Sequence, residues 1–257
     1  MIIDGQDKDI RGDASICNAV WEQYYKVLGA VFGEQYRSSE IIRKGFVTGC
    51  LDSDLTTRLV KMVERAGTVP FTSNHARENF AFSSGVDQYE DTINADHHHF
   101  KLTPAMLWQL NEVTQTLSPT IQKAIGTPWR VLNVRIWNTP ASNAIEERKG
   151  SLAWHLDGMP PDMLKLLIYL TDLSPETGSV EWKLSENETS ALEGPAGSWM
   201  LFQNSGVIHR GIPPIKPGTH RTMLELTITP SAINNLTVVH GGNNARHPWR
   251  FWQTDLL

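Results

Sequence analysis

Cysteine is scarce in this sequence: Cys17 and Cys50 are the only two in 257 residues. So few thiols exclude a disulfide framework and favour a reducing compartment, so we expect a cytoplasmic protein. No apolar run approaches the roughly 20 residues that a membrane-spanning helix needs. The first residues also lack the basic and apolar stretches of a signal peptide. The sequence therefore predicts an intracellular protein with no membrane partner.

Clusters of basic residues are missing as well. The chain has 23 Lys and Arg against 28 Asp and Glu, a formal net charge of −5. Proteins that bind a phosphate backbone gather basic side chains on one surface, so nucleic acid is not an expected partner. Hydrophobic residues are present in ordinary measure, at 40% of the total, and are enough for a substantial core.

The N-terminal part of the chain has helical periodicity. Over residues 14–32 it predicts an amphipathic helix that packs one apolar stripe on a sheet. The stripe consists of Ile16, Val20, Tyr24, Val27, Leu28 and Val31. Residues 41–51 then predict a short strand. A second helix is expected to begin at a cap formed by Asp52 or Ser53 and to stop at Gly67.

The next stretch is less regular. Residues 69–96 predict a loop with one short strand near 80–82. The run His97-His98-His99 is interpreted as a solvated loop or the rim of a pocket, because consecutive histidines point in different directions and do not converge on one ion. Thr103 followed by proline predicts a helix start. A further short helix is expected from Ser118 to Gly126.

From Trp129 onward the hydrophobic period changes to two, which is typical of strands. The stretch 131–137 places two apolar residues on one face and a mixed polar set on the other. The apolar face carries Val134 and Ile136, and the other carries Asn133, Arg135 and Trp137. A polar face within such a strand indicates the lining of a cavity. The polar stretch 138–150 predicts a mobile loop, placed where an active-site lid could sit.

Short strands separated by Gly and Pro turns fill the rest of the chain, which predicts a mainly β barrel or jelly roll. The predicted strands are 164–170, 180–184, 198–202, 207–209 and 221–229. With no internal repeat and no linker, we expect a single domain over 1–257. Residues 1–128 would give mostly helical support and 129–230 the core. The aromatic tail 231–257 would fold back over the barrel or across a subunit interface, which leaves a homo-oligomer open.

The pattern that carries chemistry is His155-Leu156-Asp157, followed later by His209 and Arg221. In a strand, side chains at i and i+2 point to the same face, so His155 and Asp157 can grip one ion. Two histidines and one carboxylate form the facial triad of non-haem Fe(II) oxygenases, which leaves coordination positions open. The competing interpretation is that the histidines are ordinary core or surface residues and that Arg221 is a surface charge at the start of a strand.

These stretches together resemble the Fe(II)/2-oxoglutarate-dependent oxygenases, and among them the phytanoyl-CoA hydroxylase-like branch. The resemblance rests on His155–Asp157, Leu164–Asp172, Thr177–Ser179, Gly197–Phe202, His209–Gly211 and Arg221. It implies a double-stranded β-helix, or jelly-roll, core flanked by N-terminal helices. It also implies Fe(II) held by His155, Asp157 and His209, with 2-oxoglutarate and O2 consumed and succinate and CO2 released. Arg221 would bind the distal carboxylate of 2-oxoglutarate through its planar fork.

Four further residues are assigned on the same basis. Asn133 and Tyr169 are expected to hydrogen-bond 2-oxoglutarate, or else to satisfy backbone groups at the barrel mouth. Arg135 and Trp137 are expected to hold an anionic or partly apolar substrate, or else to form a structural ion pair and a packed ring. His220 should face the opposite side of its strand from Arg221 and lie at the surface.

The expected activity is hydroxylation, or another oxidation, of a C–H bond in a small metabolite or natural-product intermediate. A protein or peptide hydroxylase would share the chemistry and differ in its pocket, which should then be an open groove. A non-redox, cupin-like metal-binding protein would also use histidines and a carboxylate on a jelly roll. That protein would hold Zn or Mn and would not need Arg221.

Overall fold

The computed structural model describes residues 8–66, 68–70, 98–100, 102–141, 152–157, 162–203 and 205–234. Its helices are α1 (Lys8–Arg37), α2 (Glu40–Lys44), α3 (Ser53–Arg65) and α6 (Pro104–Ile125). Its strands are β1 (Phe46–Cys50), β2 (Thr68–Pro70), β3 (His98–Phe100), β4 (Trp129–Pro140), β5 (Leu164–Tyr169), β6 (Val180–Lys183), β7 (Thr189–Ala191), β8 (Ser198–Gln203), β9 (His209–Gly211) and β10 (His220–Pro230). Among these residues, no helix is both long and apolar enough to span a membrane.

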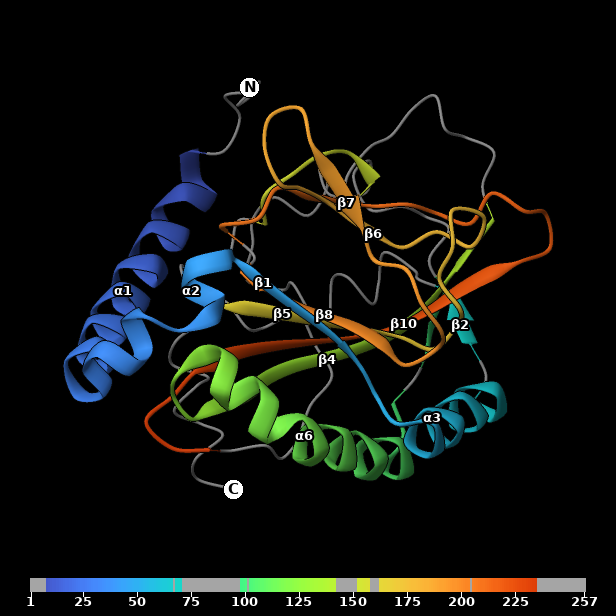
Figure 1. Cartoon of the computed structure of the whole chain (residues 1–257), viewed down its shortest axis with the longest axis horizontal. Helices are drawn as coiled ribbons and strands as arrows, with labels where there is room; N and C mark the ends of the chain where they lie inside the picture. The colour runs from blue at the N-terminus through green and yellow to red at the C-terminus, as the bar shows by residue number, and fades with distance from the viewer. Residues whose placement is uncertain are drawn as a thin grey trace.

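The strands form two antiparallel sheets, so the fold is mainly β. A seven-stranded sheet has the order β1-β8-β5-β10-β4-β3-β2, and a three-stranded sheet has the order β7-β6-β9. Figure 1 shows α3 and α6 below the large sheet and β6 and β7 above it. The large sheet is therefore the middle layer, with helices on one face and the small sheet on the other.

The lower face of the large sheet is apolar and packs on the helices. Its side chains include Val134, Ile136, Leu166, Ile168, Trp199, Leu201, Leu224, Leu226 and Ile228. They form one core with Leu55 and Leu59 of α3 and with Leu110, Val113 and Ile121 of α6. The amphipathic stripes of α3 and α6 bury themselves here, because burial of apolar area is the main favourable term in folding. We call this face the outer face.

The opposite face, which we call the inner face, points toward the three-stranded sheet. Its apolar members are Trp137, Leu167, Tyr169, Met200, Phe202 and Met223, and they pack on Val180 and Trp182 of β6. Strand β10 lies at the centre, with Glu225 opposite Arg135 of β4 and opposite Leu167 of β5. The predicted alternation along β4 and β5 is confirmed, since Val134 and Leu166 face the helices while Trp137 and Leu167 face inward.

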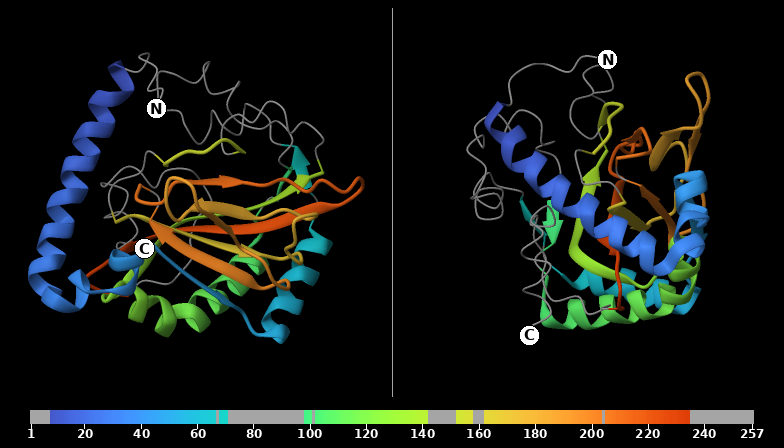
Figure 2. Two further views of the ribbon diagram at one scale, coloured as in Figure 1. Left: turned by 45° about the horizontal axis from the view of Figure 1, so that its top comes forward. Right: turned by 90° about the vertical axis from the view of Figure 1, so that its left-hand side faces the viewer.

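Helix α1 begins earlier than predicted and is kinked at Gly33, just after the predicted end at residue 32, and only part of the predicted stripe is buried. Figure 2 shows it along one flank of the sheets. The large buried side chains of α1 are Trp21, Tyr25, Leu28 and Tyr36. Within the predicted stripe Leu28 is buried and Tyr24 partly buried, whereas Val20, Val27 and Val31 are exposed. The predicted stripe was therefore wrong at its three valines and right at Leu28. The side of α1 that carries Trp21 and Tyr25 has more apolar area to bury than the side that carries the valines. The Tyr25 hydroxyl also lies 2.8 Å from Thr229 Oγ1, a hydrogen bond that a valine cannot make.

Three local predictions were also wrong in detail. The start of the predicted strand 41–51 is the short helix α2, which ends at Gly45 with φ 79°. Residues 118–126 do not start a new helix, since α6 continues through Pro119 and its buried stripe runs from Met106 to Ile125. The backbone at 98–100 is the strand β3 and not a loop. The predicted strand 80–82, residues 142–150 of the predicted lid and residues 235–257 of the tail lie outside the described residues, and residues 138–140 of that lid belong to β4.

Candidate metal centre

The segment that carries His155 is joined to the small sheet beside β9. A single antiparallel bridge pairs His155 with His209. The amide of each residue donates to the carbonyl of the other, and both hydrogen bonds measure 3.0 Å. Because the two residues lie directly opposite each other, their side chains project to the same side. The two imidazole centroids are 4.3 Å apart.

Asp157 completes a compact group of metal-ligating side chains. One nitrogen or oxygen from each of His155, Asp157 and His209 lies within 4.8 Å of the others. His155 Nε2 is 3.4 Å from Asp157 Oδ1, and His209 Nε2 is 3.8 Å from Asp157 Oδ2. The structure therefore brings together the three residues that the sequence analysis selected as ligands. Within the described part of the chain it is the one such group.

Backbone carbonyls fix which imidazole nitrogen faces the centre. His155 Nδ1 lies 2.8 Å from the Ala153 carbonyl, and His209 Nδ1 lies 2.9 Å from the Val207 carbonyl. A carbonyl only accepts, so each Nδ1 must carry the proton and donate it. Each Nε2 then keeps its lone pair and points toward Asp157. This is the arrangement in which a partner beyond the metal orients a histidine ligand.

The charges of the group match what metal binding requires. Burial, and then Lys165, lower the pKa of His209 to about 4, so this imidazole is neutral at pH 7. Burial alone would raise the pKa of Asp157, but Lys165, with His155 and His209, holds it well below its ordinary value. The centre thus offers a carboxylate and a neutral imidazole, the forms in which these groups ligate metals.

Lys165 and Glu225 are site residues that the sequence analysis missed. Lys165 Nζ forms an ion pair with Asp157 Oδ2 and lies 3.8 Å from Glu225 Oε2. Glu225 is 4% exposed and in turn pairs with Arg135. Side chains of alternating charge thus run from Asp157 through Lys165 and Glu225 to Arg135, across β5, β10 and β4. A charged residue at an inward position of a predicted strand was the available signal, since such a residue needs a partner.

Arg221 is buried at the start of β10, with an exposed fraction of 2%. Its Nη1 donates to the carbonyls of Ser179, at 3.1 Å, and Ile212. Its Nη2 lies 3.4 Å from Thr139 Oγ1. Among the described residues no carboxylate pairs with it, and its Nε has no hydrogen-bond partner. Burial lowers its pKa, and a buried guanidinium without an anion is costly.

Gly178 explains part of how Arg221 is held. This glycine has φ 71°, and a Cβ on it would lie 2.1 Å from the Ile212 carbonyl oxygen. That oxygen accepts the hydrogen bond from Arg221 Nη1. A larger residue at 178 would therefore displace the backbone that surrounds the guanidinium.

The remaining predicted residues also lie on the inner face. Tyr169 is 1% exposed, its ring centroid is 5.8 Å from the Arg221 guanidinium carbon, and burial raises its pKa to about 12. Asn133 is buried two positions from Arg135 on β4. Arg135 is engaged by Glu225 and lies 5.2 Å from the Trp137 ring centroid. The alternative of a structural ion pair at Arg135 thus has a specific partner, Glu225.

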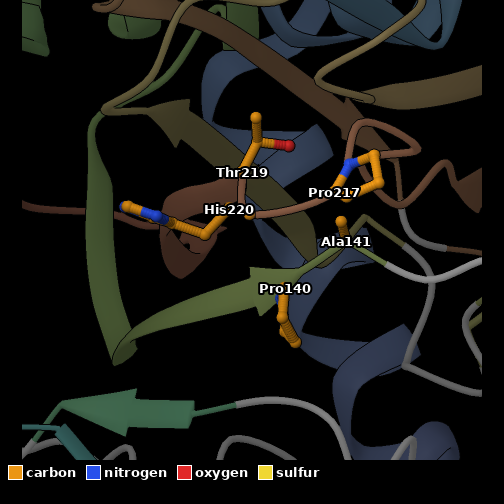
Figure 3. A pocket seen from close by; sticks show the side chains of 6 residues that line it. Pro140, Ala141, Pro217, Thr219 and His220 are labelled. Atoms are coloured by element: carbon orange, nitrogen blue, oxygen red, sulfur yellow. The ribbon is translucent and has the colours of Figure 1, made fainter.

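His220 faces away from Arg221, as predicted: it is exposed while Arg221 is buried. It lines a surface hollow with Pro140, Ala141, Pro217, Gly218 and Thr219 at the end of β4 and β10. Figure 3 shows this hollow and its prolines. None of the predicted metal ligands lines this hollow.

Comparison with known proteins supports the fold. No family model matches the sequence, and no curated protein matches it. Among solved structures, an oxidoreductase of the 2OG-Fe(II) oxygenase family from Burkholderia pseudomallei aligns with a TM-score of 0.52 at 13% identity, over 80% of this chain and 95% of that chain. The non-heme alpha ketoglutarate dependent epimerase SnoN from nogalamycin biosynthesis aligns with a TM-score of 0.50 at 12% identity, over 82% and 88%. The chain therefore has the fold of the 2-oxoglutarate/Fe(II) oxygenases.

Proposed function

We propose that the protein is a non-haem Fe(II)- and 2-oxoglutarate-dependent dioxygenase. One observation carries the proposal: the His-Asp-His group and the buried Arg221, with which no carboxylate of the described residues pairs, both lie on the side of the large sheet that faces the small sheet. We infer that the two sheets are the double-stranded β-helix of one domain over 1–257. The phytanoyl-CoA hydroxylase-like branch and a cytoplasmic location remain our sequence-based assignments.

The donor set fits a divalent iron. His155 and His209 would bind through Nε2 and Asp157 through its carboxylate, which leaves positions open for other ligands. When bound together, Fe(II), 2-oxoglutarate and O2 supply the oxidising power, with release of succinate and CO2. The chain's own part is to hold the two imidazoles in one tautomer and orientation, through the Ala153 and Val207 carbonyls.

Arg221 fits the distal carboxylate of 2-oxoglutarate. An anion there would meet the buried positive charge and give Nε a partner, which removes the cost of an isolated buried charge. Thr139 Oγ1 and the Tyr169 ring flank the guanidinium. We assign Tyr169 and Asn133 as further contacts of 2-oxoglutarate, since both are buried on the inner face.

A small-molecule substrate is the better-supported class. SnoN acts in nogalamycin biosynthesis, and one of its structures is a complex with Fe3+, alpha ketoglutarate and nogalamycin RO. We therefore propose oxidation of a C–H bond in a small metabolite or natural-product intermediate. Arg135 and Trp137 are the proposed substrate contacts. Arg135 keeps partial access, at 30% side-chain exposure, while Glu225 holds it over the ring.

The test begins with the purified protein under anaerobic conditions. Addition of Fe(II) and then 2-oxoglutarate should produce a weak visible charge-transfer band, and admission of O2 should release succinate. Absence of both the band and 2-oxoglutarate binding would overturn the proposal. A screen of small metabolites, natural-product intermediates and peptides for faster succinate release then separates a small-molecule enzyme from a protein hydroxylase.

Arg221 separates the oxygenase from a cupin-like binding protein. Arg221→Leu should leave Fe(II) binding intact and weaken 2-oxoglutarate binding at least about 30-fold, because truncating one partner of a buried charge pair costs about 2–5 kcal/mol. Arg58→Ala is the matched control, since Arg58 forms an exposed pair with Glu112. If Arg221→Leu binds 2-oxoglutarate as tightly as the wild type, the cupin-like alternative gains support.

A further inference from the structure

The two short segments joined by the His155–His209 bridge also carry side chains that point away from the metal centre. Side chains alternate along a strand, so the neighbours of the two ligands, Trp154 and Arg210, project away from the metal centre. The guanidinium carbon of Arg210 lies 4.3 Å from the centroid of the Trp154 ring. Directly behind the two imidazoles, a cation is thus stacked on an indole.

Arg210 is itself held in place from β6. Its Nε donates to Glu181 Oε2 at 2.6 Å, and its Nη2 reaches the same oxygen at 2.6 Å. Glu181 is the direct cross-strand partner of Arg210, and Thr189 of β7 donates to its other oxygen at 2.9 Å. The guanidinium therefore presents a fixed face to Trp154, because its donors are used up on one side.

A second cation approaches the same ring. Lys183 Nζ is 5.4 Å from the centroid of Trp154, and Lys183 lies two positions from Glu181 on the same face of β6. Trp154 and Arg210 are both only partly exposed. All three strands of the small sheet therefore contribute to the contact that holds Trp154, the residue before His155.

We propose that Trp154 and Arg210, with Glu181, form a clasp that sets the spacing of His155 and His209 from the outer surface of the small sheet. This inference rests on the proposed metal site. The segment 152–157 is attached to β9 by a single bridge, so the backbone alone fixes it weakly. The Lys165–Asp157 ion pair holds the segment beyond His155, the clasp holds it before His155, and without the clasp the two Nε2 atoms lose their common target. Trp154 and Arg210 are positioning residues, since they act only through the ligands that follow or precede them.

The experiment measures binding of Co(II) alone to the full-length protein, by visible absorption and calorimetry. Trp154→Ala and Arg210→Ala should each weaken Co(II) binding about 10- to 100-fold, as loss of a group that orients a metal ligand does. The ligand-field bands should shift as well. Trp154→Phe keeps a ring face and should weaken binding by less than about threefold. Trp108→Ala is the matched control, because Trp108 is 76% exposed on α6.

A structural role without positioning would lower the melting temperature of the metal-free protein and leave Co(II) affinity and spectrum unchanged. That outcome would overturn the clasp, as would equal affinity in Trp154→Ala, Trp154→Phe and the wild type. If Trp154→Ala fails to fold, Glu181→Ala gives the same test, since it removes the acceptor that holds Arg210 without removing a ring. Failure of the wild type itself to bind Co(II) would instead overturn the proposed function.

Discussion

The two faces of the large sheet are equally buried and chemically opposite. Every residue of β10 from Arg221 to Pro230 is buried. Even so, Leu224, Leu226 and Ile228 pack on helices, while Arg221, Met223 and Glu225 face the small sheet. The outer face gains stability from apolar area alone, whereas the inner face contains charges whose burial must be compensated by partners. The fold thus separates stability from chemistry along one strand.

The largest effect that would sharpen this contrast is expected at a proposed metal ligand, His209, which lies on β9 of the small sheet opposite the inner face. His209→Ala should abolish metal binding and succinate release, because the remaining His155 and Asp157 no longer surround an ion. Metal content by mass spectrometry and a coupled succinate assay measure it. His220→Ala, at an exposed position of β10, should match the wild type. Retained iron and activity in His209→Ala would remove this residue from the proposed site.

Truncation of an outer-face side chain should instead lower stability and leave metal binding unchanged. Leu226 is fully buried in the core shared with α6. Leu226→Ala should lower the free energy of unfolding by about 2–5 kcal/mol through lost transfer energy and a residual cavity. The folded fraction should bind metal as the wild type does. Chemical denaturation and metal titration of the same samples measure both quantities, and a large change in metal affinity with little loss of stability would contradict the separation of the faces.

Glu225 tests the charge compensation of the inner face. Burial would raise its pKa, but Arg135 and Lys165 lower it, so its carboxylate contributes stability that is present above about pH 4.5 and is lost as the pH falls. Glu225→Gln leaves both cations without their shared anion. It should cost about 2 kcal/mol at pH 7, less than a fully buried pair, because Arg135 is 30% exposed.

The difference in free energy of unfolding between Glu225→Gln and the wild type should narrow as the pH falls below about 4.5. Urea unfolding at pH 7 and at acidic pH measures it. Glu112→Gln removes an exposed pair with Arg58 and should change stability by less than about 1 kcal/mol at either pH. A gap for Glu225→Gln that widens on acidification would contradict the assigned direction of its pKa.

The smallest effect is expected beside the inner face, at the start of β5. Asp162 has φ 61° and accepts a hydrogen bond from the Tyr36 hydroxyl at 2.9 Å. Burial raises its pKa, which means that the fold disfavours its charge. Asparagine tolerates this backbone conformation and carries no charge. Asp162→Asn should therefore raise the free energy of unfolding by about 1 kcal/mol at pH 7, which corresponds to a melting temperature a few degrees higher.

That gain should vanish at acidic pH, where Asp162 is itself protonated. Thermal unfolding followed by circular dichroism at both pH values measures it. The same change at the exposed Asp54 should bring no gain. A lower melting temperature for Asp162→Asn at pH 7 would show that the carboxylate is needed in its charged form.

Much of the β region follows from local pattern. The alternation over 131–137 and 164–170 predicts which side chains share a face, and the structure confirms this for Val134 against Trp137 and for Leu166 against Leu167. Period-two patterns are reliable here because each face meets a uniform environment. The buried side of α1 was not predictable in this way, since apolar residues occupy both of its sides and only packing selects between Val27 and Tyr25.

For the site, the sequence by itself determined the residue types of the proposed ligands, the His155–Asp157 spacing and the inward placement of Arg135 and Trp137. The tertiary structure alone decided that Lys165 and Glu225 join them. Strands β4, β5 and β10 are far apart in the chain, and only their register places Lys165, Glu225 and Arg135 within reach of one another. Local pattern sets the direction of a side chain, but the partner of a buried charge depends on which strand lies beside it.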